Sequence, residues 1–223
     1  MTDGAARGFL LCFEGVEGTG KSSHLGRLAD WLRERGTQVT TTREPGGTPL
    51  GESLRAATMD PDGEPPTPEA ELFLILAARA QHVARVLEPA LRAGRVVLCD
   101  RFSEASLAYQ GGGRGLGVER VATADRLATG GLRADLVLLF DAPSDVILDR
   151  LQRRRESRGL DRLDREDQEF FTRVRDTYLS LAAAEPDRFV VINTAGDPDD
   201  VAAAIRAEVL PRLEAAGLTG DRG

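Results

Sequence analysis

A short glycine-rich segment constrains this chain more than any other feature. Residues 15–22 read G-V-E-G-T-G-K-S, directly after an apolar run over Phe9–Glu14 and at the start of a helical pattern. The pattern G-x-x-x-x-G-K-[ST] between a strand and a helix wraps backbone N–H groups around a nucleotide phosphate. Its lysine reaches the β- and γ-phosphates and the hydroxyl that follows ligates Mg²⁺. We expect a phosphate site made of Gly15, Val16, Glu17, Gly18, Thr19, Gly20, Lys21, Ser22 and Ser23.

Lysine usage supports this interpretation. Of the 29 basic residues, only Lys21 is a lysine. A planar guanidinium is a poor substitute for the compact ammonium that the motif needs. The alternative is a glycine-rich turn that matches by chance, and the position of the one lysine argues against it.

Composition excludes several classes of partner. The net charge of −7 repels nucleic acid and anionic membranes. The apolar runs Phe9–Phe13 and Leu136–Phe140 are far short of the roughly 20 residues that a membrane helix needs. Cys12 and Cys99 lie in apolar runs, which favours free thiols over a disulfide. We expect a cytoplasmic protein without a signal peptide and without membrane or nucleic-acid partners.

Alternating patterns predict the fold class. Strand-like runs separate helical patterns over 21–35, 69–92 and 118–128, each followed by a glycine that ends a helix. Such alternation implies an α/β fold, a five-stranded parallel sheet covered by helices on both faces. We expect one domain over 1–223, with a proline-rich loop at 60–68 and a frayed tail at 217–223. The predicted strands are Phe9–Glu14, Gln38–Thr42, Arg95–Asp100, Asp135–Asp141 and Arg188–Asn193.

Two further segments bear on the chemistry. Asp100 and Arg101 follow a predicted strand at the edge where α/β sheets bind ligands, so they suit Mg²⁺ and a second phosphate. A surface ion pair is the alternative. Residues 150–165 hold seven arginines and three acidic residues, which indicates a lid over transferring phosphate rather than a solvated helix face. The guanine signature N-K-x-D of GTPases is missing. Asp100 and Asp141 are not followed by the Glu that activates water in many ATPases, so hydrolysis is not expected.

Together these motifs resemble the bacterial thymidylate kinases from about Gly8 to Leu213. The resemblance rests on residues 15–22, REPGG at 43–47, DRF at 100–102, SLAYQGGGRG at 106–115 and LDRL at 160–163. It implies transfer of the γ-phosphoryl group of ATP to dTMP with Mg²⁺, and a homodimer. A kinase for another pyrimidine monophosphate and a nucleotide-binding module without turnover are the rival interpretations.

The resemblance also implies roles for individual residues. Glu17 approaches the acceptor sugar and the metal, which Ser22 and Asp100 also serve, and Arg101 binds the acceptor phosphate with help from Arg43. Arg79 binds the thymine edge, with Ser106 and Gln110 near the base, and Tyr109 crowds the 2′ carbon. Because position 18 is glycine, Lys21 and Arg101 are expected to act with a lid arginine, Arg154 or Arg158.

Purely structural roles remain alternatives for three of these features. Arg79 could be a surface residue of a long helix, Tyr109 a core aromatic and REPGG a tight turn. The chain also departs from the family, because Ile75 stands where an aromatic residue stacks on the base. Phe73 lies two residues away and so on nearly the opposite helix face.

Overall fold

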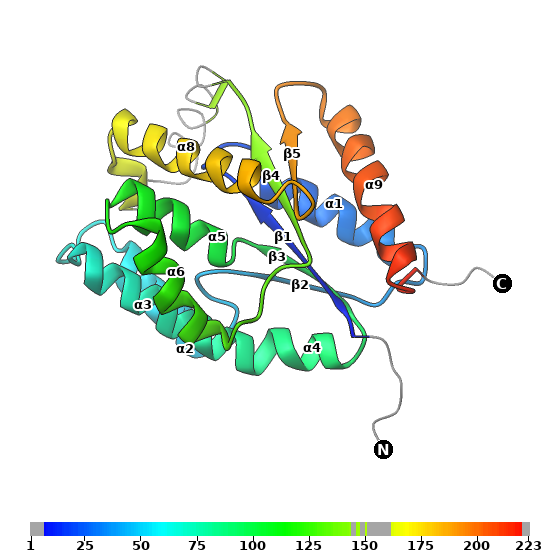
Figure 1. Cartoon of the computed structure of the whole chain (residues 1–223), viewed down its shortest axis with the longest axis horizontal. Helices are drawn as coiled ribbons and strands as arrows, with labels where there is room; N and C mark the ends of the chain where they lie inside the picture. Colours follow the sequence, from blue (N-terminus) through cyan, green and yellow to red (C-terminus); the bar gives the residue numbers. More distant parts are fainter. Residues whose placement is uncertain (1–6, 144–145, 148–149, 151–161, 220–223) are drawn as a thin grey trace.

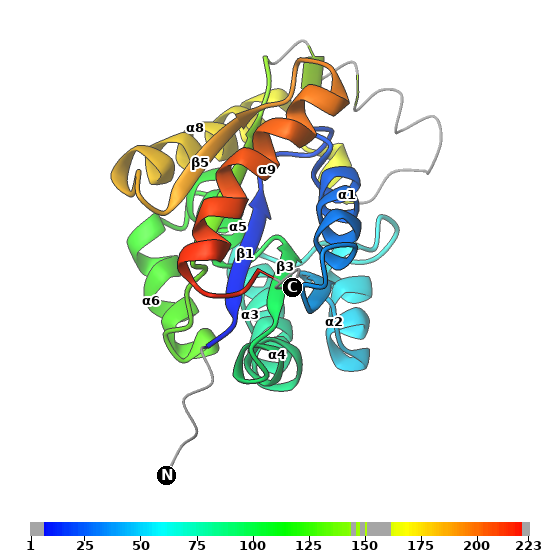
Figure 2. The same ribbon diagram turned by 90° about the vertical axis from the view of Figure 1, so that its right-hand side faces the viewer.

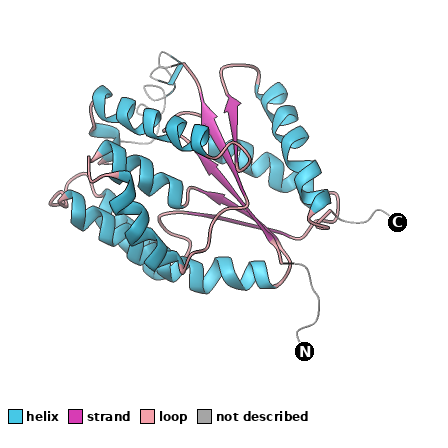
Figure 3. Ribbon diagram, viewed as in Figure 1, coloured by secondary structure: helices cyan, strands magenta, loops and turns pink. Residues whose placement is uncertain are grey.

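The computed structural model describes residues 7–143, 146–147, 150 and 162–219. Its centre is a parallel sheet with strand order β2-β3-β1-β4-β5, shown in magenta in Figure 3. The predicted architecture is confirmed, and each strand starts or ends within one residue of its expected position. The strands are β1 (Phe9–Glu14), β2 (Val39–Arg43), β3 (Val96–Asp100), β4 (Leu136–Asp141) and β5 (Phe189–Asn193).

Helices cover both faces of the sheet (Figures 1 and 2). One face carries α1 (Lys21–Arg33) and α9 (Pro198–Ala215). On the other face, the helical segments are α3 (Pro68–His82), η1 (Val83–Leu87), α4 (Glu88–Arg92), α5 (Ser103–Ser106), η2 (Leu107–Gly113) and α8 (Gln168–Ala184). Helices α2 (Pro49–Met59) and α6 (Val118–Thr129) pack against α3, and a short turn, η3 (Leu163–Arg165), precedes α8. None of the helices in the described ranges is long and apolar enough to cross a membrane.

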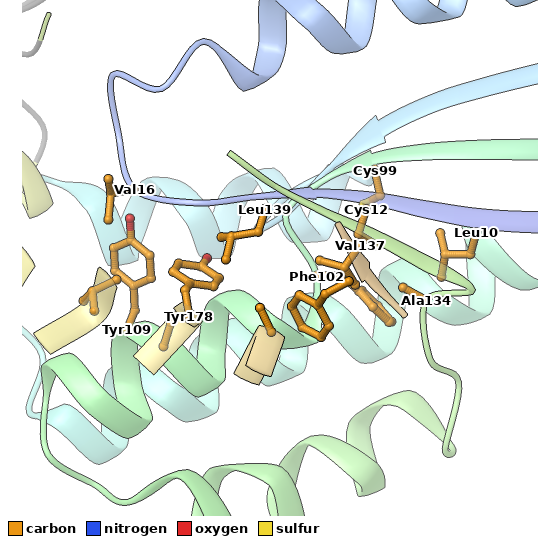
Figure 4. Packing of buried hydrophobic residues seen from close by; sticks show 14 of the residues in the cluster. Leu10, Cys12, Val16, Cys99, Phe102, Tyr109, Ala134, Val137, Leu139 and Tyr178 are labelled. Atoms are coloured by element: carbon orange, nitrogen blue, oxygen red, sulfur yellow. The ribbon is translucent and has the colours of Figure 1, made fainter. Parts of the chain in front are cut away.

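Strand alternation divides the core into two layers. Leu11 and Phe13 pack toward α1 and α9, whereas Leu10 and Cys12 pack toward the opposite helices, as expected for a period of two. Figure 4 shows the second layer, in which the rings of Tyr109 and Tyr178 lie beside each other near the end of β1. The carboxyl ends of β1, β2 and β3 lie together at one edge of the sheet, because Phe13 and Arg43 both pair with Asp100.

The prediction of one continuous α-helix over 69–92 is wrong. A π-helical turn, η1, interrupts it, and the Glu88 N–H bonds to the Val83 carbonyl five residues back. The next residue, Pro89, has no N–H to continue the α-helical ladder, which accounts for the break. The first helix also ends at Arg33 instead of residue 35, and Gly36 follows it with a φ of 81°.

Candidate active site

The loop between β1 and α1 needs glycine at two of its turns. Gly15 has a φ of 129°, and a Cβ there would lie 2.2 Å from the Phe140 carbonyl oxygen. Gly20 forms the N-cap of α1 with a φ of 87°. Both positions lie in the region that side chains rarely adopt. The chain therefore wraps tightly at the N-terminus of α1, where N–H groups and the helix dipole favour an anion.

The Lys21 side chain folds back into this loop. Its Nζ donates to the carbonyl oxygens of Gly15 at 2.9 Å and Val16 at 2.8 Å. Burial and the nearby Arg101 cation lower the pKa of Lys21 to about 8. The ammonium is thus held at the loop centre in an environment where a bound phosphate would stabilise its charged form.

A cavity of about 680 Å³ opens beside the loop. Within the described residues, the loop side chains divide between this cavity and the interior. Val16 packs into the core and Thr19 Oγ1 donates to the Val16 carbonyl, so both contribute only backbone groups. The predicted site residues that line the cavity are Glu17, Gly18, Gly20, Lys21, Ser22, Ser23, Arg43, Ile75, Arg79, Asp100, Arg101, Ser106, Tyr109 and Gln110.

Two oxygen donors converge at the mouth of the loop. Ser22 Oγ donates to Asp100 Oδ2 at 2.6 Å, which joins the start of α1 to the end of β3. Mg²⁺ prefers oxygen ligands and typically takes only one or two from the protein, with the rest from phosphates and water. In the described part of the chain, no group of three acidic, cysteine or histidine side chains is arranged to hold a metal alone. The donor set fits a Mg²⁺ that is bound together with a nucleotide.

Arg101 joins the loop to the opposite wall of the cavity. Its Nη2 donates to Glu17 Oε1 at 2.7 Å and to Tyr109 Oη at 3.1 Å, and Tyr109 Oη donates to Glu17 Oε2 at 2.5 Å. Burial alone would raise the pKa of Glu17, but Arg101 and Lys21 outweigh it and the pKa is lowered. Glu17 is therefore an anion between two cations.

The backbone at Arg101 is held in an unusual conformation. Its φ of 71° makes it the one described non-glycine residue with a positive φ, a costly geometry that is found at functional sites. Glu14 helps to hold this backbone conformation, since Glu14 Oε1 accepts a hydrogen bond from the Phe102 N–H at 2.7 Å. Glu14 Oε2 accepts the Tyr178 hydroxyl at 2.7 Å, and Arg101 Nη1 donates to Tyr178 at 3.2 Å. Burial and the neighbouring Glu104 raise the pKa of Glu14 to about 8.

Arg79 lines the cavity and is almost completely buried. Its Nε donates to Glu44 at 2.7 Å, and Nη2 donates to the Phe102 carbonyl at 2.8 Å. Nη1 donates to Ser106 at 2.9 Å and to Asp125 at 2.6 Å. Four of its five N–H groups are engaged by described residues, which leaves at most one for a ligand. The alternative that Arg79 is an ordinary surface residue of a long helix is therefore wrong.

The helix that carries Arg79 turns Ile75 toward the cavity. Ile75 is 6% exposed and lines the cavity, whereas Phe73 is 64% exposed. The prediction that Ile75 and Phe73 lie on nearly opposite faces of this helix is confirmed. Arg43 also lines the cavity, and its Nη2 donates to Glu52 at 2.7 Å.

Several residues of this site were not predicted from the sequence. Tyr178 and Asp125 reach it from distant segments, and no local pattern marks them. Glu44 lies within REPGG at 43–47, but no role was assigned to it from the sequence. Glu14 has a weak signal, a carboxylate that ends the buried run before the loop. The expected lid arginines, Arg154 and Arg158, lie outside the described residues.

Comparisons with known proteins lead to one family. The family model described as thymidylate kinase matches residues 13–205. A thymidylate kinase of Pseudomonas syringae pv. tomato is 48% identical over 206 residues, which cover 92% of this chain and 96% of that protein. One from Pelobacter propionicus is 45% identical over 206 residues, 91% of this chain and 94% of that protein.

A solved structure leads to the same family. The crystal structure of thymidylate kinase from Ehrlichia chaffeensis is similar with a TM-score of 0.73 and 29% identity, covering 92% of this chain and 99% of that one. The phosphate loop, the cavity and the matches across most of the sequence all lead to one conclusion: the chain belongs to the thymidylate kinase family.

Proposed function

We propose that the one cavity described above carries out the reaction of this family. The chain is a kinase that transfers the γ-phosphoryl group of ATP to dTMP, giving dTDP and ADP. The observation that carries the assignment of residues is that Lys21 of the phosphate loop and Arg101 of the opposite wall line one cavity with Glu17 between them. An oxygen of the dTMP phosphate attacks the γ-phosphorus while the bond to the leaving ADP oxygen breaks. Positioning and charge neutralisation supply the catalysis, with no covalent enzyme intermediate.

On the donor side, Lys21 and the loop N–H groups bind the ATP phosphates. We assign Ser22 and Asp100 to Mg²⁺, with Glu17 nearby, and the ion neutralises phosphate charge when it is bound. The oxygen pair at 2.6 Å supports this assignment. Arginines 154 and 158 of the lid, which we place at about 150–165, are the proposed cations for the charge that develops during transfer.

On the acceptor side, we assign Arg101 and Arg43 to the dTMP phosphate. The ring of Tyr109 crowds the 2′ carbon of the sugar, and Ile75, Arg79, Ser106 and Gln110 surround the base. All of these residues line one cavity, in which Arg101 donates to Tyr109 at 3.1 Å and Arg79 donates to Ser106 at 2.9 Å, and this supports their assignment to one bound nucleotide.

The assembly and location follow the family resemblance. We propose a single kinase domain that forms a cytoplasmic homodimer. Two large apolar side chains support the dimer, since Phe73 on α3 and Leu127 on α6 are 64% and 86% exposed on helices that pack together. Both cysteines are buried free thiols, which fits a reducing compartment. Light scattering should give about twice the chain mass of 24.0 kDa, and the chain mass itself would contradict the dimer.

Paired variants test the division of the cavity into two halves. Lys21→Ala should lower kcat by at least about a hundredfold, because it removes charge stabilisation in the transition state. Arg101→Ala should mainly raise KM for dTMP and leave KM for ATP within about threefold. Arg33→Ala, an exposed arginine of α1, is the control. Near-normal turnover of Lys21→Ala, or an Arg101→Ala effect confined to ATP, would contradict the assignment.

A further inference from the structure

A buried carboxylate, Glu71, lies behind the base end of the cavity. It belongs to α3 and is 1% exposed. Gln110 Nε2 donates to Glu71 Oε1 at 2.7 Å. Arg114 Nε donates to both carboxylate oxygens at 3.2 Å, and Arg162 Nη2 donates to Oε2. The described residues thus surround Glu71 with hydrogen-bond donors only.

This environment keeps Glu71 ionised. Burial alone would raise the pKa of Glu71, but the hydrogen bonds from Arg114, Gln110 and Arg162 outweigh it, and the pKa is lowered. An ionised carboxylate only accepts hydrogen bonds. The Gln110 side chain must therefore present its NH₂ group to Glu71, and a flipped amide would set two acceptors against each other in a buried place.

The fixed amide determines what Gln110 presents to a ligand. Gln110 lines the cavity, and within the described part of the chain its Oε1 has no hydrogen-bond partner. Arg79 lines the same cavity and has at most one N–H group left to donate. The base end of the cavity therefore offers the Gln110 carbonyl as an acceptor and no more than one Arg79 N–H as a donor.

These two groups match the edge of one class of pyrimidine. Thymine and uracil carry an N3–H donor beside a C4 carbonyl acceptor, whereas cytosine carries an N3 acceptor beside a C4 amino donor. Gln110 Oε1 and the free Arg79 N–H complement the imide of thymine. Cytosine in the same position would set acceptor against acceptor and donor against donor. Sites that use buried polar groups in this way reject the wrong partner strongly.

We propose that Glu71 is a specificity-determining positioning residue, which holds the Gln110 amide so that its carbonyl reads the N3–H of the acceptor base and excludes cytosine. This inference rests on the assignment of Gln110 and Arg79 to the base. It gives Glu71 a role beyond the structural link between α3 and the arginines. Glu71 itself does not touch the substrate.

Glu71→Gln is the sharpest variant because it keeps the shape and removes the charge. Arg114 and Arg162 then both donate to the single carbonyl of the new amide, so its NH₂ group faces Gln110. This NH₂ group needs an acceptor, so the Gln110 amide must flip and present its carbonyl oxygen to it. We expect kcat/KM for dTMP to fall and kcat/KM for dCMP to rise, so that their ratio drops at least about tenfold. KM for ATP should stay within twofold. Since both acceptors are measured on one preparation, the ratio does not depend on the folded fraction.

Glu166→Gln is the matched control. Glu166 Oε1 lies 2.7 Å from Arg114 Nη2 and 4.0 Å from Arg162 Nη1, so it shares both arginines with Glu71. No hydrogen bond joins Glu166 to Gln110 among the described residues. Glu166→Gln should therefore leave the dTMP to dCMP ratio within about twofold. An equal drop in both variants would show that the ratio follows the arginines, and would overturn the proposal.

A double-mutant cycle separates this proposal from the site assignment on which it rests. Gln110→Met should lower the ratio by itself, and adding Glu71→Gln should then change it no further, because Glu71 acts through Gln110. If Gln110→Met leaves the ratio unchanged, the assignment of Gln110 to the base is wrong. If Gln110→Met lowers the ratio but Glu71→Gln does not, the base site stands and the role of Glu71 is contradicted.

Discussion

The Arg101 guanidinium donates to the Glu17 carboxylate at 2.7 Å, which links the end of β3 to the phosphate loop. In the proposed function, Glu17 belongs to the donor half of the cavity and Arg101 to the acceptor half. Their charges are set by the same contact, because Arg101 lowers the pKa of Glu17. Under the proposed assignment, this partly buried ion pair would set the distance between donor and acceptor phosphates, so changes to its neighbours should alter turnover more than folding.

The pKa of Lys21 predicts a proton uptake that accompanies ATP binding. With a pKa of about 8, the side chain is half neutral at pH 8 and protonated below about pH 7. The phosphates of ATP favour the ammonium and raise this pKa, so binding at pH 8 should take up roughly half a proton. Calorimetry in buffers of different ionisation enthalpy measures the number. Lys21→Met provides the baseline, and equal uptake by both proteins would contradict the assignment.

The Tyr109 hydroxyl and ring should have separable effects. Tyr109→Phe removes the hydrogen bonds to Glu17 and Arg101, so kcat should fall by about tenfold, or roughly 1.4 kcal/mol. It keeps the ring, so the preference for dUMP over UMP, which differ only at the 2′ position, should persist. Tyr109→Ala should lose that preference. A ratio that Tyr109→Phe alters as much as Tyr109→Ala would show that the ring does not make the choice.

The lid hypothesis predicts a kcat effect for one of two arginines. Arg154→Ala or Arg158→Ala should lower kcat by at least about tenfold and leave KM for dTMP nearly unchanged, if the cation acts in the transition state. Arg165→Ala is the control from the same run, because Arg165 Nη1 donates to the Pro61 carbonyl at 2.6 Å in an exposed position. If all three variants behave alike, the lid mechanism is wrong.

The cavity should accept an aromatic ring at position 75. Ile75→Phe should lower KM for dTMP several-fold, because base stacking is worth about 1 to 3 kcal/mol and an aliphatic contact recovers only part of it. Phe73→Ile makes the reverse exchange on the exposed face of α3 and should leave KM unchanged. A raised KM in Phe73→Ile, or no change in Ile75→Phe, would contradict the base position.

The sheet and the phosphate loop are predictable from the sequence because local signals specify them. The run Phe9–Glu14 is apolar and ends at Gly15, whose conformation only glycine adopts easily. The break at η1 was also marked, since Pro89 cannot complete an α-helical ladder. The expectation of one long helix gave too little weight to that proline.

The buried polar network is not predictable in the same way. Arg79 bonds to side chains 27, 35 and 46 residues away, and Arg101 bonds to Tyr178, 77 residues away. Such partners meet only after the sheet has formed, so no local spacing marks them. An arginine assigned to the base edge by resemblance therefore turned out to have four of its five N–H groups already engaged within the protein.

We propose that one cavity transfers a phosphoryl group from ATP to a monophosphate whose base has an N3–H and whose sugar lacks a 2′-hydroxyl. A coupled ADP-release assay with dTMP, dUMP, UMP and dCMP tests it most directly. We predict acceptor-dependent release with the highest kcat/KM for dTMP, a lower value for dUMP, and at least about a hundredfold lower values for UMP and dCMP. ADP release that does not depend on an acceptor, or a kcat/KM for dCMP or UMP that equals that for dTMP, would contradict the account.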